Sequence, residues 1–308
     1  MNALWIAGPL IGFVGMMSGG FWGVGCGWIV VPAMLILGFD PFDAVGIGLL
    51  QMVPATIPTV VRQFPEIGWR TGDPGRLLVL PLAVGAIGAS LFGKMFNEKL
   101  FALFGGPEIL QWMLAGFILV VACQTACSRT LVRADEFPSF SPAKRAGVFV
   151  TGVATGVLSS MLGVGGGLLM RPLLTSGFKV PEYFTSRIVR LMVTLTTLSG
   201  GITYLFQSGT VAWQVLWGAV LVSAGGFAGF PLGTRMHTVA FNAGYAQYIH
   251  KSFAIPAGAM FLNTLLNVTG CREASRIAMV VIAFGVAAGL VLFTWYAAHH
   301  RKENGGAI

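Results

Sequence analysis

Charge is scarce in this sequence, and acidic charge most of all. Only 10% of the 308 residues are charged, while 55% are hydrophobic and the mean hydropathy is +0.79. Soluble domains carry about 25% charged residues. The low charge content therefore excludes a soluble domain and indicates an integral membrane protein in contact with the lipid bilayer. In a soluble protein, the net charge of +8 would suggest nucleic-acid binding. Here we attribute it to basic cytoplasmic loops and expect no nucleic-acid partner.

The signatures of enzymes and of metal sites are also missing from the sequence. It contains no His/Cys cluster, no pair of carboxylates within an apolar run and no HExxH motif. The four cysteines have no paired spacing, which argues against a disulfide framework and a metal site. The glycine patterns lack the βαβ context of a dinucleotide site. We therefore predict that the protein is not an enzyme and uses no metal and no cofactor.

Long apolar runs make up most of what is present. They extend over about 17 to 23 residues, whereas the strands of a membrane barrel would alternate over roughly ten. We therefore predict an all-α integral membrane fold. The first run, Ala3 to Met17, lacks the basic start of a cleaved signal and is expected to be an uncleaved helix. Crossing helices are expected near residues 43–62, 77–96, 109–128, 186–206, 212–232, 250–269 and 275–297.

Two apolar segments are broken by clustered glycines in the same pattern. Trp22 to Pro32 reads WGVGCGWIVVP, and Leu162 to Pro172, 140 positions later, reads LGVGGGLLMRP. Each glycine within a helix is unfavourable by roughly 1 kcal/mol relative to alanine, so neither copy suits an uninterrupted helix. Each broken segment is either a re-entrant hairpin or two short crossings, and in both cases the chain returns to the side where the segment began. The glycines concerned are Gly23, Gly25 and Gly27 in the first copy and Gly163, Gly165, Gly166 and Gly167 in the second.

The same offset divides the chain into two similar halves. The first break is expected over Gly19 to Gly27, followed by a short helix from Trp28 to Gly38, and the second broken segment covers 146–178. Between the halves lies a polar connection with proline, serine and mixed charge, which is typical of a linker. We predict a first membrane repeat over 1–128, a cytoplasmic linker over 129–145, a second repeat over 146–298 and a cytoplasmic tail over 299–308. Each repeat has one glycine-broken segment and three membrane helices.

Basic residues are distributed unequally between the two sides of this arrangement. Three crossings in each repeat make the second repeat start on the opposite side from the first, so the repeats are inverted. The loops on the N-terminal side carry Lys94, Lys99, Arg272 and Arg276. The other side carries fourteen basic residues: Arg62, Arg70, Arg76, Arg129, Arg133, Lys144, Arg145, Lys179, Arg187, Arg190, Arg235, Lys251, Arg301 and Lys302. The positive-inside rule predicts a multi-pass plasma-membrane protein with its N-terminus outside and its C-terminus in the cytoplasm.

The duplicated G-V-G-x-G-x₄-P pattern in two inverted halves resembles the TauE/SafE family of sulfite and organosulfonate exporters, over roughly residues 10–295. The resemblance implies a secondary transporter of small anions, with substrates such as sulfite and sulfoacetate. The sequence departs from its own second copy at Cys26, opposite Gly166, and at Trp28, opposite Leu168.

Substrate-binding candidates follow from the chemistry of a helix broken at membrane depth. The break frees backbone N–H groups at the positive end of the next helix, which favours an anion. Arg171 lies about 10 Å of helix from the end of its segment near Phe178, and so deep a cation indicates a functional residue. Arg187 and Arg190 are candidates in the span that follows. Gln51 beside the position matching Arg190, and Ser160 before the second break, add uncharged candidates.

Alternatives remain at this point. The glycines also suit close helix packing. Arg171 and Arg190 also suit snorkelling to the cytoplasmic interface or pairing with Glu182, and Arg187 also suits anchoring there. In function, the leading hypothesis is an alternating-access anion exporter that binds its substrate between the two glycine breaks. A gated anion channel and a non-transporting membrane assembly subunit are the alternatives. The oligomeric state is left open, with a homodimer as one option.

Overall fold

The computed structural model describes residues 2–70, 72–106, 108–127, 141–207 and 210–300. Within these ranges the chain is helical apart from one short antiparallel ladder, in which Phe206–Gln207 (β1) pairs with Thr210–Val211 (β2). Seven helices are long and apolar enough to cross a membrane, and a bent pair of helices gives an eighth candidate. The predicted all-α membrane fold is confirmed. Most of the predicted linker and tail, 128–140 and 301–308, lies outside the described residues.

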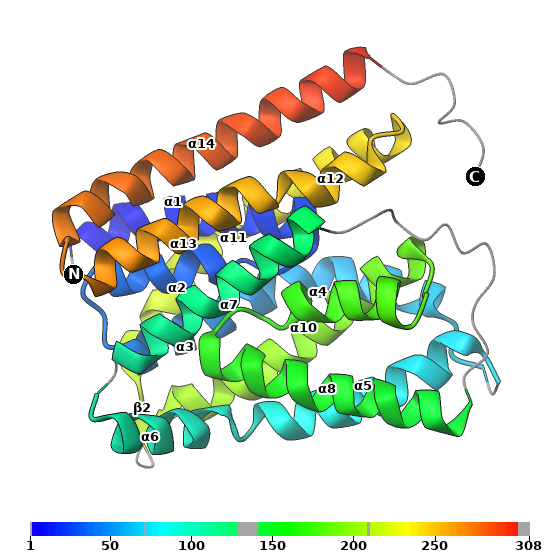
Figure 1. Cartoon of the computed structure of the whole chain (residues 1–308), viewed down its shortest axis with the longest axis horizontal. Helices are drawn as coiled ribbons and strands as arrows, with labels where there is room; N and C mark the ends of the chain where they lie inside the picture. The colour runs from blue at the N-terminus through cyan, green and yellow to red at the C-terminus, as the bar shows by residue number, and fades with distance from the viewer. Residues whose placement is uncertain (1, 71, 107, 128–140, 208–209, 301–308) are drawn as a thin grey trace.

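Short connections join the helices in both halves of the chain (Figure 1). The first half contains α1 (Asn2–Trp22), α2 (Gly27–Ile36), α3 (Pro41–Leu50), α4 (Met52–Gln63), η1 (Phe64–Ile67), α5 (Pro74–Ser90), α6 (Gly93–Phe104) and α7 (Glu108–Cys127). The second half contains α8 (Pro142–Leu162), α9 (Gly167–Pro172), η2 (Leu173–Gly177), α10 (Glu182–Leu205), α11 (Trp213–Asn242), α12 (Ala246–Ser252), α13 (Ala254–Val268) and α14 (Arg272–His299).

The first glycine break is the tip of a helical hairpin. A Cβ built at Gly15 of α1 would lie 3.1 Å from the Cγ2 atom of Val30 in α2, so α2 folds back along α1. The ten residues of α2 extend about 15 Å, which is half of the roughly 30 Å hydrocarbon layer. In Figure 1, α2 runs back toward the end of the molecule at which α1 begins. Both forms that the sequence left open share this fold-back, and the choice between a re-entrant hairpin and two crossings stays open.

Two pairs of neighbouring helices pack in the same way in the two halves. A Cβ built at Gly225 of α11 would lie 1.8 Å from the carbonyl oxygen of Pro9 in α1. A Cβ built at Gly85 of α5 would lie 2.5 Å from the carbonyl oxygen of Phe149 in α8. Both members of one contact are 140 positions from their counterparts in the other. Glycine at these points lets the backbones touch, as in small-residue interfaces between membrane helices.

Helix α10 packs antiparallel to α3 and α4, its own counterparts under the offset of 140. Along the contact, Arg187 meets Glu66, Thr194 meets Thr56, and Gly201 lies against Leu50. Residue numbers rise on one side as they fall on the other. Inverted repeats require this relation between equivalent helices, while the division into two inverted repeats stays a prediction.

Three predicted boundaries are wrong. Helix α1 continues to Trp22 rather than ending before Gly19, because glycine at position 20 lets it approach α11, where a Cβ would lie 2.5 Å from the Phe230 carbonyl oxygen. Helix α11 continues to Asn242 rather than ending near residue 232. The span predicted over 250–269 is two helices, α12 and α13, which meet at Phe253 because its ring packs on Trp28, with the ring centroids 5.0 Å apart.

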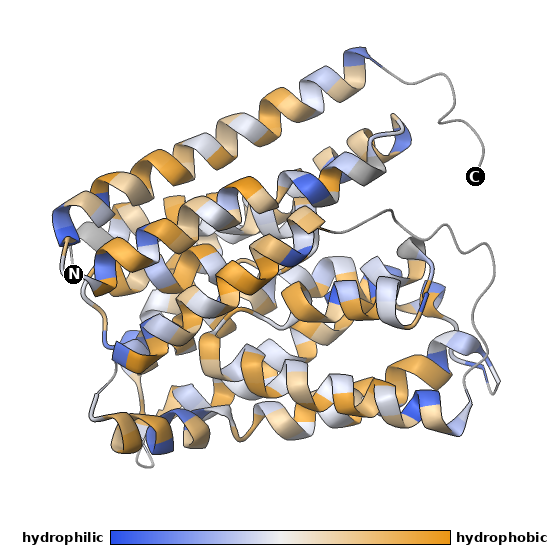
Figure 2. Ribbon diagram, viewed as in Figure 1, coloured by the Kyte–Doolittle hydropathy of each residue, from blue (hydrophilic) through white to orange (hydrophobic). Residues whose placement is uncertain are grey.

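Many large hydrophobic side chains are exposed on the helical assembly, and hydrophobic residues predominate along its helices (Figure 2). Helix α14 is the most exposed of the candidate spans, with only 17% of its most apolar window buried, and its Phe284 and Trp295 are exposed. Such a surface suits contact with lipid tails. The buried polar groups instead gather around the hairpin tips in the interior, where the candidate site lies.

Candidate functional site

The tips of the two glycine-broken hairpins lie against each other in the interior of the protein. A Cβ built at Gly27 would lie 1.8 Å from the carbonyl oxygen of Gly163, and a Cβ built at Gly167 would lie 3.1 Å from that of Val24. At each tip a glycine, which has no side chain, therefore lets the backbone of the other tip come into contact. This crossing brings the two predicted breaks together.

The turns at these tips need glycine for their backbone conformation as well. Gly23 and Gly163 have φ values of 68° and 71°, and Gly25 and Gly165 have values of 82° and 81°. Side chains other than glycine rarely adopt this left-handed region. The matched values show that both tips turn in the same way, so the duplicated sequence pattern produces a duplicated backbone.

Cys26 is where the two tips differ. Its φ is −119°, whereas Gly166, the corresponding residue, has a φ of 70°. Gln51 is fully buried, and its Nε2 donates hydrogen bonds to the Cys26 sulfur and, at 3.2 Å, to the Gly48 carbonyl oxygen. Its Oε1 atom is buried without a partner among the described residues. The structure therefore places the predicted Gln51 at the first break.

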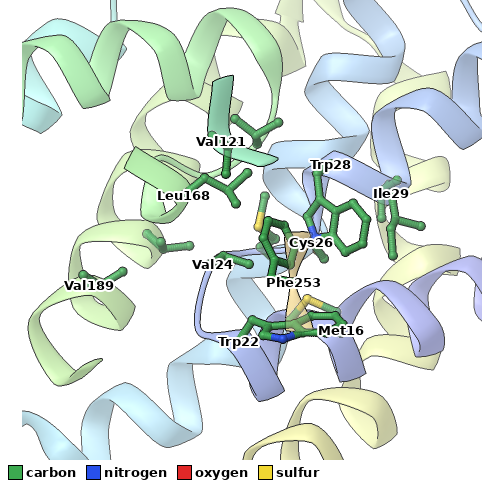
Figure 3. Close-up of a cluster of buried hydrophobic side chains, with 14 of the residues drawn as sticks. Met16, Trp22, Val24, Cys26, Trp28, Ile29, Val121, Leu168, Val189 and Phe253 are labelled. Atoms are coloured by element: carbon green, nitrogen blue, oxygen red, sulfur yellow. The ribbon is translucent and has the colours of Figure 1, made fainter. Parts of the chain in front are cut away.

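Aromatic side chains surround the start of α2 beside Cys26 (Figure 3). The ring centroid of Trp22 lies 5.2 Å from that of Phe253, and Trp28 packs on the same ring. Trp28 is fully buried. The large side chain at this position, where the second copy has Leu168, makes the first hairpin tip bulkier than the second.

Arg171 reaches from the second hairpin to the first. It is 3% exposed, and its Nη1 donates a hydrogen bond to the backbone carbonyl oxygen of Trp22, the last residue of α1. Its Nη2 donates to the Ser186 hydroxyl at 3.4 Å. A Cβ built at Gly23 would lie 2.8 Å from Nη1. The guanidinium thus lies directly on the first glycine break. Its role in substrate binding stays a prediction.

Arg190 lines a small cavity beside the crossing. The cavity volume is about 10 Å³, on the scale of a single water molecule. Its walls are Met16, Gly19, Gly23, Gly25, Met52, Thr56, Arg190, Val193 and Phe230. Arg190 is 8% exposed, and its Nη1 donates to the Gln63 Oε1 atom at 3.1 Å. Two glycines of the first break and a buried guanidinium therefore line one small space.

The other two candidates lie away from this cavity. The Nε of Arg187 donates to Oε2 of Glu66 at 2.7 Å, and the pair links α10 to η1. The Ser160 hydroxyl donates to the Gly156 carbonyl oxygen of its own helix at 2.9 Å. Ser160 also adjoins Gly200, which lies ten residues beyond Arg190 and therefore about 15 Å further along α10. The structure thus does not bring Arg187 and Ser160 to the Arg190 cavity.

Sequence reasoning missed six wall residues of the cavity, among them Met52, Thr56 and Phe230. Thr56 accepts a hydrogen bond from the Thr194 hydroxyl at 2.8 Å, directly beside the cavity. A signal for two of them was present, since the residues 140 positions after Met52 and Thr56 are also methionine and threonine. Phe230 had none, because the residue 140 positions earlier is serine.

Buried arginines, crossing hairpins and a lipid-facing exterior define a multi-pass membrane protein with an internal polar site. A family model described as sulfite exporter TauE/SafE matches residues 9–249. The chain belongs to this family, and the protein is accordingly a membrane transporter rather than an enzyme. It is 26% identical over 209 residues to a probable membrane transporter protein of Methanocaldococcus jannaschii, a match that covers 64% of this chain and 70% of that one. No solved structure matches the chain significantly.

Proposed function

We propose that the protein is a secondary transporter that exports a small anion, such as sulfite or an organosulfonate like sulfoacetate, by alternating access. The observation that carries the proposal is the small cavity that Arg190 lines together with Gly23 and Gly25 of the first break. A guanidinium can bind a sulfur oxyanion with two parallel hydrogen bonds. Glycines without side chains let the anion approach the backbone.

Positive charge at this depth supports an anionic substrate. Arg171 and Arg190 are both at least nine-tenths buried, and a cation within the membrane indicates a functional site. The described residues contain no group of three or more His, Cys, Asp or Glu side chains that could hold a metal ion. We therefore assign the arginines to the anion itself.

The size of the cavity supports alternating access over an open pore. A space for about one water molecule does not admit a sulfonate, so the hairpin tips must part before the anion binds. Transporters with discontinuous helices bind substrate at such interfaces and expose the site to one side at a time. A gated channel using the same arginines is the second candidate.

Reconstitution of the purified protein into liposomes tests the proposal. We expect saturable uptake of sulfite or sulfoacetate, stimulated by the same anion inside the vesicles, and weaker uptake of sulfate and acetate. Uptake that does not saturate and shows no counterflow would support the channel. No flux with any of the four anions would favour the assembly subunit and contradict the proposal.

A further inference from the structure

Most of the residue types that line the Arg190 cavity recur at equivalent positions in the other half of the chain. Each of its nine wall residues has a counterpart 140 positions away, and five of the nine counterparts are the same amino acid. These five are Val53, Gly163, Gly165, Met192 and Thr196. Packing alone does not require a methionine, a threonine and two glycines to recur together around one space. The counterpart set therefore has the composition of a second cavity wall.

The counterpart residues other than Leu50 are buried in this structure. Met192 and Thr196 are at most 1% exposed. Ser90, the counterpart of Phe230, is fully buried and its hydroxyl lies 2.5 Å from that of Ser199. Ser199 is nine residues beyond Arg190, about 13 Å further along α10. Ser90 thus lies toward the end of α10 opposite Arg190, as does Ser159, whose neighbour Ser160 adjoins Gly200. Gly165 of the second wall instead adjoins Met52 and Val193 of the first.

The two walls differ at four positions, one of which is Gly156 in place of Met16. Leu50 stands where the first wall has Arg190, so the fixed charge is lost. Ser159 stands where the first wall has Gly19, and Ser90 adds a second hydroxyl. Together with Thr196, the second wall contains three hydroxyl groups and no formal charge. The hydroxyls of Thr196 and Ser90 donate to backbone carbonyl oxygens of their own helices.

Ser159 carries the observation that points to a ligand. Its side chain is fully buried, and its hydroxyl oxygen has no hydrogen-bond partner among the described residues. A Cβ built at Gly166 would lie 3.5 Å from that oxygen, so the hydroxyl faces the tip of the second hairpin. A buried hydroxyl without a partner is unfavourable, and an anion oxygen would satisfy it.

We infer that Ser159, Ser90, Thr196 and Leu50 form a second, uncharged subsite for the transported anion, which opens while the Arg190 cavity is closed. The inference rests on the proposed function. Hydroxyl donors bind an oxyanion less tightly than a guanidinium does, so the anion is held firmly on the Arg190 side and released from the Ser159 side. Half-saturation should be higher from the Ser159 side by roughly tenfold or more, the difference between charged and neutral hydrogen bonds.

Accessibility of Ser159 gives a test that does not need a flux measurement. In a protein with Cys123, Cys127 and Cys271 replaced by alanine, S159C should react with an impermeant thiol reagent added on the Ser159 side, and sulfoacetate should slow the reaction. T155C is the matched control, since Thr155 is equally buried one turn away and bonds the backbone of its own helix. An S159C that reacts no faster than T155C would overturn the inference.

Exchange of the two distinguishing residues gives the functional test. We expect S159A to raise the half-saturating concentration of sulfoacetate only when the anion is supplied from the Ser159 side. The double variant R190L/L50R should reverse which side has the lower half-saturating concentration. Equal half-saturation from both sides in the wild-type protein would overturn the subsite while leaving anion transport intact. If R190L/L50R does not insert, S159A decides the matter, and an S159A indistinguishable from wild type would overturn the inference. Absence of any anion flux in the wild type would overturn the proposed function as well.

Discussion

Arg171 of α9 donates a hydrogen bond to the backbone carbonyl oxygen of Trp22, the residue at which α1 ends. The bond joins the second hairpin to the first across 149 positions of sequence. Beside this bond, a Cβ built at Gly23 would lie 2.8 Å from Nη1 of Arg171. The corresponding contact, 140 positions away at both ends, is between Gly163 and Val31, where a Cβ built at the glycine would lie 2.7 Å from the Val31 Cγ2 atom. One tip is thus held by a charged hydrogen bond and the other by apolar packing.

Two replacements of Arg171 should distinguish the effect of its positive charge from that of its planar guanidinium group. R171K keeps the charge and loses the fork of the guanidinium, and we expect weak residual anion flux. R171Q loses both, and we expect almost none, with membrane insertion intact in each variant. Flux per inserted molecule in liposomes measures the effect. Near wild-type flux in R171Q would show that Arg171 is only an anchor.

Much of the fold could be predicted because long apolar runs in a sequence identify membrane helices. The apolar runs predicted the membrane helices. The clustered glycines predicted that the chain turns back at both breaks, since left-handed turns and backbone contacts both exclude larger side chains. The helix ends were harder to predict. Gly19 and Gly20 read as part of the break, yet α1 continues through them because α11 lies close enough for glycine to be useful there.

The site was less predictable, since depth along a helix does not determine which neighbour a side chain meets. Arg187 and Arg190 are three residues apart on α10, and no periodicity distinguishes them. Arg187 meets Glu66 on η1, 121 positions away, while Arg190 turns into the cavity. Partners at such separations are fixed by how the halves pack together, which one sequence alone does not reveal.

The backbone contact at the hairpin crossing should be sensitive to a single methyl group. In G27A, the new Cβ would lie 1.8 Å from the Gly163 carbonyl oxygen, so the tips must separate. We expect a strong loss of anion flux and a lower melting temperature in detergent. The matched control is G88A in α5, where nothing lies within 4 Å of the new Cβ and alanine favours the helix by roughly 1 kcal/mol. Equal flux in G27A and G88A would argue against a tight crossing.

Two native cysteines can test the predicted orientation. Cys271 is exposed between α13 and α14, and Cys127 is exposed at the end of α7, near the opposite end of the molecule (Figure 1). With the N-terminus outside, an impermeant thiol reagent added to intact cells should label the C123A/C127A variant through Cys271. It should label C123A/C271A, which retains Cys127, only after the cells are opened. The reverse pattern would show that the orientation is wrong.

Arg190 and Arg187 form a natural pair for the last prediction, because they are close in sequence and differ in surroundings. Arg190 lines the cavity, so R190Q removes a charge-assisted hydrogen bond to the anion, and we expect half-saturation to rise roughly 10- to 100-fold. Arg187 is bonded to Glu66, which is 44% exposed, and exposed ion pairs contribute about 0–1 kcal/mol. R187Q should therefore lower stability slightly and leave half-saturation nearly unchanged. Sulfoacetate uptake by both variants, normalised to inserted protein, measures the difference. A larger effect for R187Q than for R190Q would move the anion from the cavity to the Glu66 end of α10.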